Sequence, residues 1–88
     1  MLEYDRKKLG EYLKEVRETA GLTQHDVSAK LGYSSPQFIS NIERGISVVP
    51  LKALSRMITM YKAPTDAVVR LILESQKKLL KAKLVRKN

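Results

Sequence analysis

The sequence predicts an all-α protein with five helices. Apolar residues recur at spacings of three and four along most of the 88-residue chain, and no alternating run is long enough for a strand. Gly21, Gly32 and Gly45 each follow such a stretch, at the place where a helix C-terminus favours a residue with positive φ. A chain of this length forms one domain with a single small core.

The first helix follows Asp5, its expected N-cap, and its inward face is expected to hold Leu9, Leu13, Val16 and Ala20. Gly10 lies inside this helix, where glycine is about 1 kcal/mol less favourable than alanine. Two explanations remain open: the close approach of another helix, or an ordinary surface position.

Two short helices come next. Thr23 and Asp26 have the spacing of a capping box at the start of the second helix, whose inward residues are Val27 and Leu31. The third helix is expected to begin with Ser35 as N-cap and Pro36 as its first residue, and to end at Gly45. Its inward residues are Ile39 and Ile42.

The fourth helix is expected from Pro50 to about Tyr61, and Pro64 separates it from a fifth helix that Thr65 or Asp66 caps. These boundaries divide the chain into a domain over residues 1–63 and a basic C-terminal helix over residues 64–88. The apolar face of the fourth helix is Leu51, Leu54, Met57 and Ile58, and the fifth helix is apolar nearly all round from Val68 to Leu73.

Charge is the strongest compositional signal. The chain has 17 Lys and Arg against 9 Asp and Glu, a net charge of +8, which points to an anionic partner. Without cysteine and with one histidine, the chain is expected to hold no metal or cofactor. Since no phosphate loop or catalytic triad spacing occurs, no enzyme activity is expected. The absence of a signal peptide or membrane span makes the cytoplasm the expected location.

The connection between the second and third helices carries the functional information. Two short helices joined by only about four residues, Gly32 to Ser35, match the helix-turn-helix unit. The residue types add to the spacing: Leu22-Thr23-Gln24 opens the second helix and Ile39-Ser40-Asn41-Ile42-Glu43-Arg44-Gly45 closes the third. Over about residues 9 to 61 the sequence closely resembles the phage repressor/Cro-type helix-turn-helix family, also called the XRE family. One departure is the turn at Tyr33-Ser34-Ser35, one residue longer than the shortest turn in that family.

The outward face of the third helix is the expected DNA-reading surface. Glutamine and asparagine side chains can each form two hydrogen bonds with adenine, and the resemblance implies that Gln37 and Asn41 read bases. The alternative is an ordinary solvated helix face. Phe38 could contact a thymine methyl group or the sugar backbone, or could pack on Tyr33. The predicted base contacts are Pro36, Gln37, Phe38, Ser40 and Asn41.

The resemblance also implies contacts beside the base-reading face. At the start of the second helix, the Gln24 side chain and free backbone N–H groups can bind a phosphate. The predicted phosphate contacts are Thr23, Gln24, His25, Ser35 and Arg44. In related repressors, the positions matching Arg17 and Glu43 form an ion pair that fixes the angle of the recognition helix.

The C-terminal helix has three interpretations. Residues 64–88 carry seven basic and two acidic side chains. The helix could be a final core helix with a solvated end, a homodimer interface through Leu73, Leu80 and Leu84, or a source of phosphate contacts from Lys77 to Lys87. We expect a sequence-specific, dimeric repressor that binds double-stranded DNA. The alternatives are an antitoxin-like module that binds an acidic protein through this helix, and non-specific nucleoid or RNA binding.

Overall fold

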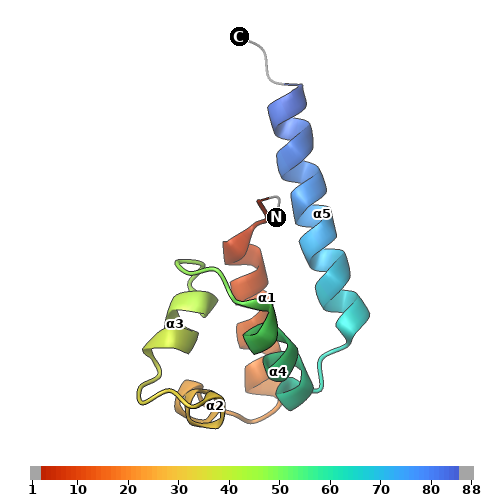
Figure 1. Cartoon of the computed structure of the whole chain (residues 1–88). Coiled ribbons are helices and arrows are strands. Elements are labelled where there is room, and N and C mark those ends of the chain that lie inside the picture. Colours follow the sequence, from red (N-terminus) through yellow and green to blue (C-terminus); the bar gives the residue numbers. More distant parts are fainter. Residues whose placement is uncertain (1–2, 86–88) are drawn as a thin grey trace.

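The computed structural model describes residues 3–85, and within them it contains five helices and no strand. The helices are α1 (Arg6–Thr19), α2 (Gln24–Leu31), α3 (Gln37–Glu43), α4 (Leu51–Tyr61) and α5 (Thr65–Leu84). Figure 1 shows α1 to α4 gathered into a bundle, with α5 running beside α1 and extending past it. The predicted all-α fold is confirmed.

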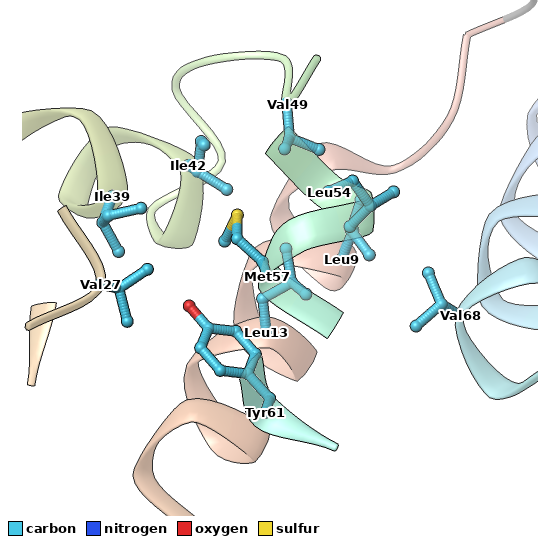
Figure 2. Packing of buried hydrophobic residues seen from close by; sticks show 10 residues of the cluster. All are labelled: Leu9, Leu13, Val27, Ile39, Ile42, Val49, Leu54, Met57, Tyr61 and Val68. Atoms are coloured by element: carbon cyan, nitrogen blue, oxygen red, sulfur yellow. The ribbon is translucent and has the colours of Figure 1, made fainter. Parts of the chain in front are cut away.

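One core joins all five helices (Figure 2). Most of the predicted inward residues are buried in it, which confirms the spacing that predicted them. Ala20 and Leu51 are exceptions: Ala20 follows the last turn of α1, and Leu51 begins α4 one turn before the buried stripe, with 70% of its surface exposed. The buried apolar residues are Leu9, Leu13, Val27, Ile39, Ile42, Val49, Leu54, Met57, Tyr61 and Val68.

The first two helices begin as the sequence predicts. The Asp5 carboxylate accepts a hydrogen bond from the Lys8 backbone N–H at 2.9 Å. Thr23 and Asp26 form a complete capping box: the Thr23 hydroxyl accepts from the Asp26 N–H at 3.0 Å, and the Asp26 carboxylate accepts from the Thr23 N–H at 2.9 Å. These bonds satisfy N–H groups that have no partner inside the helix.

The starts of α3, α4 and α5 differ from the predictions. Pro50, expected as the first residue of α4, is its N-cap, and the helix begins at Leu51. Pro36, at φ −77° and ψ 1°, is the N-cap of α3, so the helix begins at Gln37 and not at Pro36. Ser35 still satisfies a free N–H group at the start of this helix, because its hydroxyl accepts a hydrogen bond from the Gln37 N–H at 3.3 Å. Pro64 is the N-cap of α5, so Thr65 and Asp66 already lie in its first turn and neither side chain caps it.

Only the first part of α5 packs into the bundle. Val68 is buried, and the Asp5 backbone N–H donates to the buried Ser75 hydroxyl at 3.1 Å. Beyond Ser75 the helix projects, and an exposed ion pair between Lys83 and Glu3 at 2.6 Å joins it to the N-terminal segment. The radius of gyration, 14.0 Å, therefore exceeds the roughly 12 Å of a compact domain of this length.

Two further points concern the ends and surface of the chain. Arg86 and Lys87, which the basic-tail interpretation included, lie outside the described residues. Within residues 3–85, none of the helices combines the length and apolar character that crossing a bilayer requires.

Candidate nucleic-acid interface

Helix α3 is held against α1 by close backbone packing. A Cβ atom added to Gly10 would lie 2.6 Å from the Glu43 carbonyl oxygen, and one added to Gly45 would lie 2.7 Å from Lys7 Cα. Real Cβ atoms do not approach other atoms so closely, so both positions require glycine. Gly45 also has a φ of 76°, which glycine adopts without strain. Of the two explanations open for Gly10, the structure supports the close approach of a helix.

A buried polar network fixes α3 relative to α1 and α2. The predicted ion pair is present: Arg17 donates from Nε and Nη2 to the two Glu43 carboxylate oxygens, at 2.6 and 3.0 Å. Both side chains are buried. Arg17 Nη1 also donates to the Leu22 carbonyl at 2.7 Å, and Gln24 Nε2 donates to Glu43 Oε1 at 2.9 Å. The hydrogen bonds to Glu43 raise the pKa of Arg17, so the charge of the guanidinium persists despite its burial.

The turn before α3 is stabilised by two aromatic rings. Tyr33 and Phe38 stack with ring centroids 4.3 Å apart and ring planes 21° apart. Phe38 is half-buried, which favours the packing alternative that the sequence left open. A base contact through its exposed part stays a prediction. Because the stack joins the turn to the first part of α3, it limits how the outward face of α3 can rotate.

Three polar side chains interlock along the outward face of α3. Gln37 Nε2 donates to Asn41 Oδ1 at 2.8 Å, and Arg44 Nη2 donates to the same oxygen at 2.9 Å. Spacings of four and three residues place the three side chains in one stripe, opposite the buried Ile39 and Ile42. Such a stripe of hydrogen-bonding groups suits the edges of bases in a major groove.

At the start of α2, two of the side chains predicted to contact phosphate form hydrogen bonds within the protein. The Gln24 amide donates to Glu43, and the Thr23 side chain and N–H are both in the capping box. Hydrogen bonds from Thr23 lower the pKa of Asp26, which keeps a negative charge at this helix N-terminus. His25 is exposed. The carboxylate of Asp26 would oppose a phosphate here, and the phosphate contacts of Thr23, Gln24 and His25 stay predictions.

The predicted dimer residues lie on the exposed side of α5, and two of them, Leu80 and Leu84, are on its projecting part. Leu73, Leu80 and Leu84 are 58%, 43% and 74% exposed. Separations of seven and four residues put them on one side of α5, and Val69, also exposed, extends this line by one turn. We call these four residues the α5 stripe.

Comparison with known proteins assigns the family. A family model described as a helix-turn-helix domain matches residues 8–71. The chain belongs to this family. It is thus a DNA-binding regulator of transcription, as the sequence predicts, with α2 and α3 as the helix-turn-helix pair. Comparison with curated proteins finds no match.

Solved structures share this helix-turn-helix fold. The clp gene regulator ClgR from C. glutamicum is 24% identical, with a TM-score of 0.68 over 86% of this chain and 96% of that one. A point mutant of the restriction-modification controller protein C.Esp1396I is 25% identical, with a TM-score of 0.64 over 92% of this chain and 98% of that one.

Among the contacts that sequence reasoning missed, three join or order the parts of the fold around α3 and α5. These are the hydrogen bonds of Gln24 to Glu43, of Arg44 to Asn41, and of the Asp5 N–H to Ser75. The three-residue spacing of Asn41 and Arg44 could have revealed the second, because such neighbours meet on a helix surface. The other two join residues 19 and 70 positions apart, and no local signal predicts them.

Proposed function

We propose that this helix-turn-helix protein is a homodimeric, sequence-specific repressor that acts in the cytoplasm by occupying DNA and has no enzyme activity. Two copies of α3 would enter successive major grooves, about 34 Å apart, and block the polymerase. The observation that carries the proposal is the outward stripe of Gln37, Asn41 and Arg44 on a helix whose opposite side is buried. The two solved structures compared above are named as a regulator and a controller protein.

The proposed contacts follow from the position of each side chain. Gln37 and Asn41 would read bases, with Pro36, Ser40 and the exposed part of Phe38 beside them. Ser35 and the start of α2, with Thr23, Gln24 and His25, would lie near the phosphates that border the groove. The overall charge of +8 would add sequence-independent attraction that weakens as salt increases.

The α5 stripe supports a homodimer. Its apolar side chains lie in one line on a helix that projects from the bundle, where pairing with a second copy would remove them from water. The same stripe lies among Lys77, Lys81 and Lys83, which also fits an acidic protein partner. That antitoxin-like role is the second candidate function.

Enrichment of random duplexes on the purified protein at near-physiological salt tests the proposal. We expect an inverted repeat that Gln37→Ala/Asn41→Ala abolishes and that Thr65→Ala, an exposed polar control in the first turn of α5, leaves intact. Weak, salt-sensitive binding without a consensus would contradict a sequence reader.

Sedimentation of Leu80→Lys, beside wild type and Lys78→Ala, tests the dimer. We expect Leu80→Lys to be monomeric and Lys78→Ala to remain dimeric, because the exposed Lys78 lies on a different side of α5 from the α5 stripe. A wild-type protein that is monomeric on its own, free and on DNA, but forms a stable complex with an acidic protein would favour the second candidate.

A further inference from the structure

The hydrogen bonds around Asn41 restrict what this residue can offer to DNA. Its Oδ1 accepts from Gln37 Nε2 and from Arg44 Nη2, and an amide oxygen has two lone pairs. The opposite orientation of the amide would turn its own N–H groups toward two donors, so the network fixes the orientation. Asn41 therefore has only N–H donors left.

A donor-only asparagine does not suit adenine. The two-bond pairing with adenine needs an amide oxygen to accept from N6 and an amide N–H to donate to N7. Asn41 lacks the free oxygen, and the adjacent Arg44 contributes only further donors, since guanidinium has no acceptor. Guanine presents two acceptors, O6 and N7, in the major groove, and these match a patch of donors.

Gln37 keeps the opposite capacity. It uses one of its two Nε2 hydrogens on Asn41, which leaves the other hydrogen and Oε1 without a partner in the network. A free N–H beside a free oxygen is the pair that bonds adenine N7 and N6. The two amides on this helix, although alike in chemistry, therefore differ in the base that they fit.

We propose that α3 reads an adenine through Gln37 and a guanine through Asn41 and Arg44 within one half-site, and that Arg44 determines specificity instead of contacting phosphate. The inference rests on the proposed function of the same face. One helical turn rises 5.4 Å and stacked bases are about 3.4 Å apart, so the two bases lie within about two steps of each other.

The test compares variants on duplexes that carry the enriched half-site. Arg44→Ala is paired with Arg70→Ala, which removes the same charge from an exposed position on α5. We expect Arg44→Ala to lose roughly 5- to 150-fold in affinity for the guanine-containing site. On duplexes in which another base replaces that guanine, Arg44→Ala should bind as wild type does. Replacing that guanine by 7-deazaguanine, which lacks the N7 acceptor, should weaken wild type but not Arg44→Ala. Arg70→Ala should retain the guanine preference.

A double variant tests whether the two side chains act together. If Asn41 and Arg44 read one base, each single variant should already lose the discrimination between guanine and other bases at that position. Asn41→Ala/Arg44→Ala should then lose no more of this discrimination than either single variant does. The assignment is overturned if Arg44→Ala weakens all duplexes equally and lowers the salt slope by about one, as a phosphate contact would. It is also overturned if the base preference that Asn41→Ala loses is a preference for adenine. A wild type with no sequence preference would refute the proposed function as well as this assignment.

Discussion

Glu43 accepts hydrogen bonds from two helices and lies on a third. Its carboxylate receives Arg17 from α1 and Gln24 from α2, and all of these contacts lie beneath the outward face of α3. Such a buried pair adds little net stability compared with apolar residues of similar size, but removing one partner leaves the other charge without compensation. Its role at the scale of the residue is therefore to set the position of α3.

Replacing Glu43 tests this role. We expect Glu43→Leu to lower the free energy of unfolding by about 3–5 kcal/mol, because Arg17 stays buried without its carboxylate. Arg17→Met/Glu43→Leu should recover most of that loss. Urea unfolding measures both, with the exposed Glu11→Ala as control. A double variant as unstable as the single one would show that the stranded charge is not the cause.

Tyr61 shows a second effect of burial. Its ring is part of the core, but its hydroxyl is buried without a hydrogen-bond partner. Burial, with the nearby Glu43 charge, raises the pKa of Tyr61 above its ordinary value of 10.0. Because the pKa of Tyr61 is higher in the folded than in the unfolded state, the folded state holds this proton more tightly. The stability that this difference in pKa contributes is complete below pH 10 and is lost as pH rises above it.

Tyr61→Phe removes both the unpaired hydroxyl and the titration. We expect a free energy of unfolding at pH 7 that is equal to wild type or up to about 2 kcal/mol higher. We also expect a smaller loss of stability between pH 9 and pH 11. Thermal unfolding across this range measures both, with Tyr33→Phe, on the exposed turn, as the matched control. A steeper alkaline loss in Tyr61→Phe than in wild type would contradict this explanation.

At the scale of the helices, the contact between α1 and α3 sets how the outward face of α3 is oriented. Alanine favours a helix over glycine by about 1 kcal/mol, so propensity alone predicts that Gly10→Ala stabilises the protein. The structure predicts the reverse, since the added methyl group would meet the backbone of α3.

We expect Gly10→Ala to be destabilising by about 1–3 kcal/mol and to lower specific DNA affinity even where the protein is fully folded. Gly21→Ala is the comparison, because nothing lies within 4 Å of its Cβ position and only its positive φ opposes the change. It should lose about 1–2 kcal/mol of stability and keep its DNA specificity. Calorimetry and binding to one duplex measure both effects. A Gly10→Ala protein as stable as wild type would disprove the close contact.

At the scale of the whole molecule, α5 serves two regions. Its first part completes the core through Val68, and its last part projects with Leu80, Leu84 and the lysines from Lys77 to Lys83. A chain that ends after residue 76 should therefore fold, because it keeps Val68 and Ser75. It should bind DNA more weakly, because it lacks Leu80 and Leu84 and six of the 17 basic residues.

A chain that ends after Lys62 provides the contrast. It loses the burial of Val68, so we expect the free energy of unfolding to fall by at least about 1.5–3 kcal/mol compared with the chain that ends after residue 76. Circular dichroism during heating and sedimentation measure folding and self-association. If the chain that ends after residue 76 dimerises as tightly as wild type, the α5 stripe is not the interface.

The sequence by itself determined the helices, most of their boundaries and the helix-turn-helix family. Apolar spacing, the capping box at Thr23 and glycines with positive φ are local properties, so they can be read without knowing the fold. The starts of α3, α4 and α5 were misplaced by one or two residues, because a proline can serve as the N-cap itself as well as follow it.

Only the tertiary structure decided why Gly10 is glycine, which partner Gln24 has and how far α5 projects. Each of these depends on atoms that distant parts of the chain bring together. It also separated Gln37 from Asn41, two amides that the sequence treated alike, because the hydrogen bonds that each already makes decide what remains for a base. Residue type fixes the number of donors and acceptors, and packing decides which of them stay free.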